Sequence, residues 1–110
     1  MSTIAITVTG TPPQGSYASS SGQVQPDGNI QIDPGVTTIE FVRGDGQAWS
    51  FESPWITFDP AGPFTLDAGS AAQVTIEDDD PGGEDRSFEY TLHTTEGNFD
   101  PQIINKGSGG

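Results

Sequence analysis

Polar and apolar residues alternate with a period of two in several short stretches of the chain. These stretches are 4–9, 38–43, 74–77 and 87–94. Successive side chains of a β-strand point to opposite faces, so this period is typical of a strand that is buried on one face only. Residues that favour helices are scarce, and Gly and Pro interrupt the chain too often for a helix of several turns. The pattern predicts an all-β protein.

The clearest alternation lies in the last third of the chain. Phe88, Tyr90 and Leu92 fall on one face of the predicted strand, and Glu89 and His93 fall on the other. A half-buried strand of an antiparallel sheet places one such face in the core and the other in water. We therefore expect the three apolar residues to be buried and the two polar residues to be exposed.

Further candidate strands are shorter and are separated by residues that favour turns. They are 22–24, 29–32, 47–51, 55–58, 64–66 and 99–104. About seven short strands within about a hundred residues predict an immunoglobulin-like antiparallel β-sandwich, and a small open barrel is the alternative. The segment 78–86 is rich in Asp and Gly, so we expect it to close a hairpin between 74–77 and 87–94.

The length of 110 residues fits one domain. The chain shows no internal repeat and no linker that would divide it, so we expect a single β-sandwich domain over residues 1–110. Segment 11–21 contains two prolines and a run of serines, which predicts a mobile loop. Segment 106–110 is rich in glycine, and we expect a frayed C-terminus there.

The dipeptide Asp-Pro occurs more often than the composition alone would produce. Its positions are Asp33-Pro34, Asp59-Pro60, Asp80-Pro81 and Asp100-Pro101. Random pairing of the Asp and Pro residues in a chain of this length gives about one such dipeptide. Proline holds the preceding residue in an extended conformation, and an Asp side chain accepts backbone N–H bonds two residues further on. The dipeptides therefore predict stiff turns at the ends of strands.

The charge and the lack of cysteine exclude several classes of function. The chain carries 16 acidic and 3 basic residues, a formal net charge of −13, so it would repel DNA or RNA. Without Cys there is no disulfide, no thiolate nucleophile and no thiolate metal site. No stretch is apolar and long enough to span a membrane, and no signal-peptide pattern is present. We expect no membrane insertion and, by default, a cytoplasmic protein.

The only histidine, His93, is a poor candidate for catalysis. A Ser-His-Asp triad needs an imidazole held between a nucleophile and a carboxylate, whereas the alternation places His93 on the solvent face of its strand. No Gly-x-Ser-x-Gly motif marks a nucleophilic serine. We expect no catalytic residue and no enzymatic activity. A small hydrolase that uses a pair of the many carboxylates is a further alternative.

Acidic residues are most concentrated in 78–85. Their order approaches that of a twelve-residue calcium loop, but predicted strands flank it where helices are needed. Asp78, Asp80, Glu84 and Asp85 are the candidate ligands for a calcium site of another geometry, because Ca²⁺ prefers carboxylate oxygens. A solvated acidic turn explains the same residues without any ion. We expect no other cofactor.

Half of the ten aromatic residues lie between Trp49 and Phe64. In a chain this poor in leucine, we expect aromatic side chains to supply much of the core. The competing interpretation is an exposed aromatic face beside acidic residues, which would stack on sugar rings and bond their hydroxyl groups. Trp49 and Trp55 are the candidate residues for such a carbohydrate site.

The C-terminal half of the chain contains short motifs of a known family. They are Val74-Thr75-Ile76, the segment 87–92, and Asp100-Pro101-Gln102-Ile103-Ile104-Asn105. In these motifs the chain resembles the DP-EP family of small bacterial proteins, and the Asp-Pro-x-Ile-x-Asn ending carries most of the resemblance. The resemblance implies a compact β-sandwich of unknown function. It implies no catalytic residues.

These observations favour a non-enzymatic binding or interaction module that acts through loops or a sheet edge. A surface module for calcium or carbohydrate is the alternative. The expected partner is a protein or a glycan.

Overall fold

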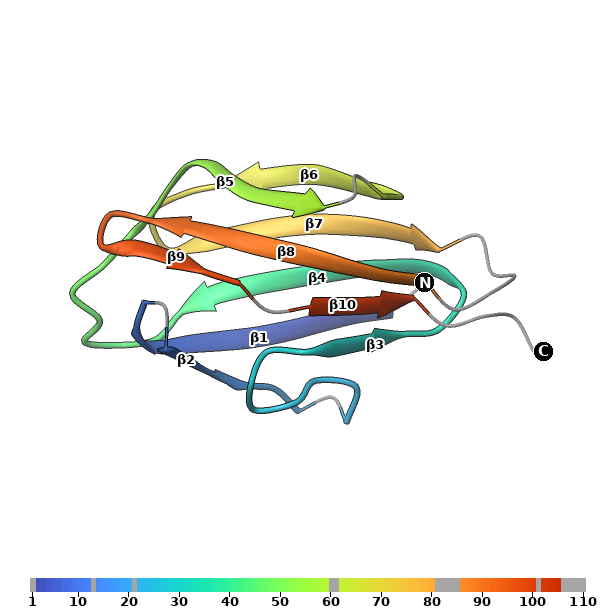
Figure 1. The fold of residues 1–110 in the computed structure, drawn as a ribbon, viewed down its shortest axis with the longest axis horizontal. Coiled ribbons are helices and arrows are strands. Elements are labelled where there is room, and N and C mark those ends of the chain that lie inside the picture. The colour runs from blue at the N-terminus through green and yellow to red at the C-terminus, as the bar shows by residue number, and fades with distance from the viewer. Residues whose placement is uncertain are drawn as a thin grey trace.

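The computed structural model describes residues 2–12, 14–20, 22–59, 62–80, 86–100 and 102–105. In this part of the chain the backbone forms ten β-strands and no helix. Figure 1 shows how the strands are arranged. The strands are β1 (Ser2–Thr11), β2 (Gln14–Ala18), β3 (Ile30–Ile32), β4 (Gly35–Arg43), β5 (Phe51–Asp59), β6 (Phe64–Gly69), β7 (Gln73–Asp80), β8 (Arg86–Thr94), β9 (Gly97–Phe99) and β10 (Gln102–Asn105). The predicted all-β class is confirmed.

The strands form two five-stranded sheets that lie face to face (Figure 1). In the first sheet, here sheet A, the order is β2-β1-β4-β7-β6. In the second, sheet B, the order is β3-β10-β8-β5. β9 also belongs to sheet B and pairs with β8 on the same side of β8 as β10 does. Consecutive strands β3 and β4, β5 and β6, and β7 and β8 lie in different sheets, so the chain crosses between the layers repeatedly.

The sheets are mixed, and the prediction of about seven purely antiparallel strands is wrong. β1 pairs in parallel with β4, and β3 pairs in parallel with β10. A parallel pair requires a crossover connection, because the chain must return to the starting end before the second strand begins. The segment that contains β2 and β3 supplies this crossover between β1 and β4.

The predicted hairpin between 74–77 and 87–94 is also wrong. β7 pairs with β4 and β6 in sheet A, whereas β8 pairs with β5, β9 and β10 in sheet B. Alternation identifies the face of a strand that is buried, but it does not identify the neighbouring strand. Two consecutive half-buried strands therefore satisfy the same pattern when they face each other across the core.

Segment 11–21 is not a loop throughout. Residues 14–18 form β2, which folds back along β1 as an antiparallel hairpin. The ring of Tyr17 is buried and packs edge-on against Phe99 of sheet B, with the ring centroids 6.2 Å apart. Burial of this aromatic side chain stabilises the strand, which the Ser and Pro content of the segment does not predict. The predicted frayed end, 106–110, lies outside the described residues.

Two other predicted strands are absent from the described structure. Residues 22–24 contribute only an isolated bridge between Val24 and Ile30. Residues 47–50 belong to the loop before β5, and the strand begins at Phe51.

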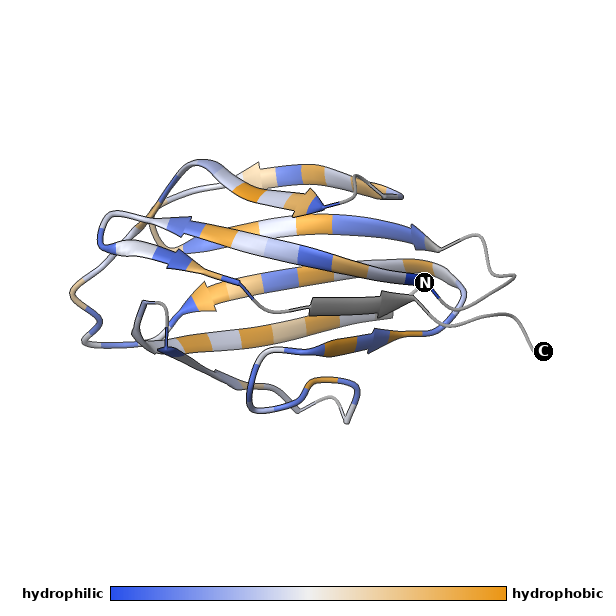
Figure 2. Ribbon diagram, in the orientation of Figure 1, coloured by the Kyte–Doolittle hydropathy of each residue, from blue (hydrophilic) through white to orange (hydrophobic). Residues whose placement is uncertain are grey.

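Apolar side chains fill the space between the sheets, and Figure 2 shows apolar and polar residues alternating along β1, β4 and β8. In sheet A, the register aligns Ile4, Ile39 and Ile76 in one row across three strands, and each is almost fully buried. Phe41 of sheet A meets Tyr90 of sheet B with ring centroids 5.2 Å apart. The two inner faces therefore pack directly on each other.

The expected burial along β8 is confirmed for four of the five residues. Phe88, Tyr90 and Leu92 are buried, and Glu89 is exposed. His93 is half-buried instead of exposed, because its ring lies against the neighbouring strand β5.

The Asp residue of each Asp-Pro pair lies at the end of a strand, as predicted. Asp33 follows β3, and Asp59 and Asp80 are the last residues of β5 and β7. At each of these three points the chain leaves one sheet for the other. Asp100 separates β9 from β10, which pair with different parts of β8. The stiffness of these turns stays a prediction, because Pro60, Pro81 and Pro101 lie outside the described residues.

The buried hydroxyl of Tyr90 leads to a prediction about stability. The hydroxyl donates a 2.8 Å hydrogen bond to the carbonyl oxygen of Gly28, which anchors the segment before β3 to the core. Tyr90→Phe removes this bond, so we expect the free energy of unfolding at neutral pH to fall by about 1–2 kcal/mol. Urea unfolding measures the change, and a Tyr90→Phe protein as stable as the parent would contradict it.

The same variant tests the alkaline limit of stability. Burial, with smaller contributions from Tyr17 and Asp27, raises the pKa of Tyr90 well above its ordinary value of 10.0. The stabilising effect of the protonated hydroxyl is therefore complete below pH 10.0 and is lost as the pH rises toward the raised pKa. We expect Tyr90→Phe to lose less stability than the parent protein in this alkaline range.

Candidate functional site

The acidic residues near the end of β7 occupy different environments. Asp78 is fully buried on the inner face of sheet A, where the register places it between Thr37 of β4 and Phe64 of β6. Its neighbour Asp79 is exposed on the outer face. Asp80 is the last residue of β7. The carboxylates of Asp78 and Asp79 therefore point away from each other.

The other two candidate calcium ligands, Glu84 and Asp85, lie outside the described residues. Within the described residues, no group of three or more His, Cys, Asp or Glu side chains is arranged to hold a metal ion. The calcium site therefore stays a prediction.

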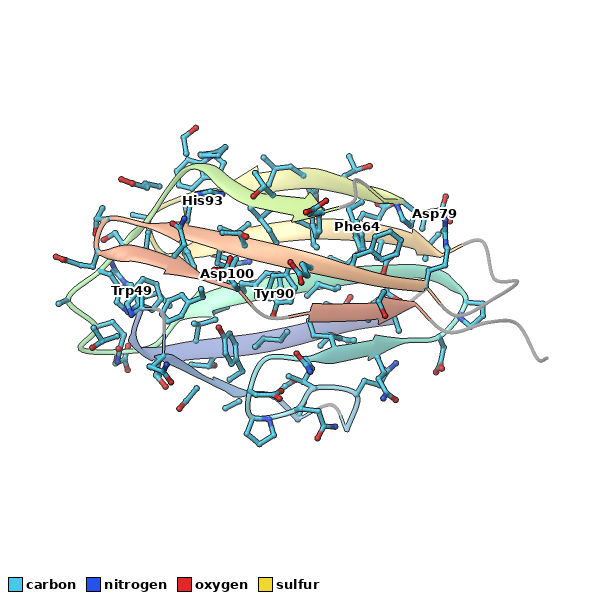
Figure 3. The ribbon with its side chains drawn as sticks, in the orientation of Figure 1. Trp49, Phe64, Asp79, Tyr90, His93 and Asp100 are labelled. Carbon is cyan, nitrogen blue, oxygen red and sulfur yellow. The ribbon has the colours of Figure 1, made fainter. Side chains whose placement is uncertain are left out.

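Trp49 is a core residue. The residue is 2% exposed, and its ring packs edge-on against Phe51 and Phe99, with centroids 5.1 and 5.3 Å away. The indole Nε1 donates a 2.8 Å hydrogen bond to the carbonyl oxygen of Gly10. The ring thus closes one end of the sandwich, opposite the end that holds Phe64 and Asp79 in Figure 3. Trp49 presents no face on which a sugar could stack.

The loop that carries Trp49 is held to the sandwich by polar contacts. Gln47 Oε1 accepts a 3.0 Å bond from the backbone N–H of Gly10. Arg43 Nη1 donates to Trp49 O at 3.3 Å and to Ser50 Oγ at 2.6 Å. One of the few cationic side chains is therefore engaged within the fold.

Trp55 lies in a different position, at the margin of the molecule. It is half-buried, and its φ of 71° is unusual for a residue other than glycine. The regular pairing of β5 with β8 is interrupted between Phe51 and Ile56, which allows this conformation. The indole ring then lies over Gly69 of β6, where a Cβ atom would approach the ring to 2.6 Å. Gly69 thus provides the space that the indole occupies.

Two further aromatic rings join β5 to β6. Phe58 of β5 stacks on Phe64 of β6 with centroids 4.1 Å apart and an angle of 9° between the planes. Phe64 also meets the edge of Phe88 at 5.0 Å. β5 and β6 are the edge strands of opposite sheets, and they lie side by side along the upper margin in Figure 1. These contacts close the sandwich along that margin.

We call this region the β5–β6 seam and define it by Trp55, Phe58, Phe64, Leu66 and Gly69. Leu66 is the most informative of these residues. It continues the apolar row of sheet A, because it is the register partner of the buried Ile76. It is nevertheless 45% exposed, and among the described residues it is the only large apolar side chain that is exposed. The row of buried side chains therefore ends in an uncovered leucine.

Negative charge surrounds the seam. The exposed acidic residues on the strands of this margin are Glu52, Asp59, Asp67, Glu77 and Asp79. Asp67 interrupts the regular pairing of β6 with β7, and Glu77 lies opposite Thr65 in the same ladder. An apolar position with acidic neighbours is suited to a ligand that is both apolar and positively charged.

His93 makes one contact that the sequence did not predict. Its Nε2 lies 3.0 Å from the hydroxyl oxygen of Thr57 on β5. A hydroxyl next to an imidazole has the distance of a nucleophile and its base. Among the described residues, however, no carboxylate is hydrogen-bonded to the other ring nitrogen to orient the imidazole. The contact is explained as a bond between neighbouring strands.

No protein-family model matches the chain, and a search of curated proteins found no match. The resemblance to the DP-EP family therefore stays a prediction. Among the described residues there is also no helix long and apolar enough to cross a membrane.

The contact between Trp55 and Gly69 leads to a prediction. In Gly69→Ala, the new methyl group would overlap the indole ring of Trp55, so we expect the ring to be displaced. The overlap should cost about 1–3 kcal/mol of stability, as other enlargements of well-packed sites do. Thermal unfolding and tryptophan emission measure the two effects. Gly22→Ala is the matched control, because its Cβ would meet no atom within 4 Å. Equal stability of the two variants would show that the position of the Trp55 ring does not depend on the space at Gly69.

Proposed function

We propose that this protein is a non-enzymatic binding module for a positively charged protein partner, and that it acts through the β5–β6 seam. The observation that supports this proposal is the exposed Leu66 at the end of a buried apolar row, with acidic residues around it. Leu66 lies on the same face of β6 as the half-buried Phe64, whose ring stacks on the half-buried Phe58, so the apolar surface at this edge extends over neighbouring side chains. A contiguous apolar surface is typical of an interaction site, whereas a single exposed leucine is not.

The charge of the whole chain supports a cationic partner. Sixteen acidic residues face only three basic ones, and one of these, Arg43, is bonded to the loop before β5. A net charge of −13 attracts a basic protein segment over distances near the Debye length, and it repels nucleic acid. The partner chemistry that fits is therefore lysine- or arginine-rich protein.

The absence of enzymatic activity remains part of the proposal. The single imidazole is bonded to Thr57 on the surface of sheet B, and no described carboxylate orients it. The finer fold description, an immunoglobulin-like sandwich, is also proposed. Two packed sheets in about a hundred residues support it, and such sandwiches bind partners through their loops and edges.

A titration with simple peptides tests the proposed function. We expect a short lysine-rich peptide to bind and a glutamate-rich peptide of equal length to show no binding. Because the attraction is electrostatic, the Kd for the lysine-rich peptide should rise about tenfold or more between low and moderate salt. Isothermal titration calorimetry measures both. Failure of the lysine-rich peptide to bind at low salt would overturn the proposal.

Carbohydrate binding is the second candidate function, and the position of Trp55 favours it. Trp55 is half-buried with its ring on Gly69, and Glu52 and Asp59 of the same strand are exposed. Aromatic rings beside carboxylates can stack on sugars while binding their hydroxyl groups.

A single-tryptophan protein tests this second candidate. Trp49→Phe leaves Trp55 as the only tryptophan, and circular dichroism checks that the variant is folded. A carbohydrate site predicts a change in the emission of Trp55 with soluble oligosaccharides, and Trp55→Phe is the control because its remaining indole is buried. Unchanged emission in the Trp49→Phe protein would remove this candidate.

A further inference from the structure

We propose that β6 binds an extended segment of the cationic partner as an added strand of sheet A. This inference rests on the proposed function and specifies its geometry. β6 is an edge strand, so one side of its backbone is available for a further ladder of hydrogen bonds.

The pairing of β6 shows which backbone groups face outward. The N–H of Asp79 on β7 donates a 2.9 Å hydrogen bond to the carbonyl oxygen of Pro63. Backbone groups in an antiparallel ladder alternate between facing the neighbour and facing away. Pro63 and Thr65 therefore face β7, and the N–H and C=O groups of Phe64 and Leu66 face the open side. Regular pairing ends after Leu66, where the register shifts.

The chain itself covers parts of two other sheet edges. On β2, the N–H of Tyr17 donates to the carbonyl oxygen of Pro26 at 3.1 Å. On β3, the N–H of Gln31 donates to the carbonyl oxygen of Gln23 at 2.9 Å. Among the described residues, the outward groups of Phe64 and Leu66 have no such covering segment.

β5, the edge strand on the other side of the seam, is poorly suited to a ladder. Pro54 has no N–H to donate, and the conformation at Trp55 breaks the regular strand. β6 is therefore better suited than β2, β3 or β5 to pair with another chain, and β9 (Gly97–Phe99) has only three residues.

The side chains of β6 specify what the added strand should carry. Phe64 and Leu66 lie on the inner face of the sheet, in register with Asp78 and Ile76 of β7. A residue of the added strand opposite Leu66 would extend the row formed by Ile4, Ile39 and Ile76. An apolar side chain at that position would cover the exposed leucine. Residues on either side of it would point to the outer face.

Charge selects the occupant of this edge. The outer face next to β6 carries Glu77 and Asp79, and Asp67 lies within β6 itself. Basic side chains on the outer face of an added strand would reach these carboxylates. A second copy of this chain would bring another −13 to the same edge, so pairing of β6 with itself is opposed. The occupant is therefore an extended segment that alternates apolar and basic residues.

Backbone hydrogen exchange with a defined probe tests this inference. The probe is a short peptide of alternating lysine and valine, and the control peptide carries proline in place of each valine. We expect the exchange of the Leu66 amide to slow about tenfold or more when the lysine-valine peptide is bound. The amides of β2 should not change. Binding without protection of Leu66 would overturn this inference while leaving the proposed function intact.

Two variants separate the backbone from the side chain. Leu66→Pro removes an N–H that faces away from β7, so the β6–β7 ladder keeps its bonds. We expect it to weaken peptide binding about tenfold or more, and Leu66→Ala to weaken it less because the N–H remains. Thr65→Ala is the matched control on the outer face and should bind as the parent does. Equal binding by all variants would overturn the inference.

Further outcomes distinguish the two proposals. If no lysine-containing peptide binds, the proposed function fails and this inference fails with it. If the protein alone dimerises and protects the amide of Leu66, the occupant is a second copy and the cationic strand is overturned. If Leu66→Pro does not fold, the exchange measurement on the parent protein still decides.

Discussion

The packing of one inner sheet face against the other holds this small protein together. Phe41 and Tyr90 meet in this contact, and both side chains are fully buried. With 31% apolar residues, the chain has few side chains to spare for this purpose. Each central strand must therefore turn one complete apolar face inward, and the strict alternation along β1, β4 and β8 follows from that requirement.

This constraint explains what could be predicted from the sequence. The faces of Phe88, Tyr90 and Leu92 were predictable because side-chain direction in a strand depends only on the local period. The neighbours of β7 and β8 were not, because strand pairing depends on residues far apart in the chain. The Tyr17 side chain illustrates the same limit: its segment has the composition of a loop, whereas its contact with Phe99 involves a residue far away in the sequence.

The candidate site was less predictable than the fold. Trp49 and Trp55 lie six positions apart in the sequence, yet one is buried and the other is at the margin. A bond from Trp49 to Gly10 and the space above Gly69 determine this difference, and both partners are distant in sequence. Alternation places Leu66 on the inner face, but it does not predict that the side chain is 45% exposed there. No local pattern contains that information.

The exposed leucine and the acidic residues around it are best understood together. A half-exposed leucine contributes about 1 kcal/mol less to stability than a fully buried one, and this is a noticeable part of the stability of a small domain. An open edge with an apolar row behind it would also favour aggregation unless something opposed it. Asp67 and the exposed acids of β7 supply that opposition through repulsion between like chains. The same charges attract a basic strand, so one set of residues keeps identical copies apart and selects the partner that we propose.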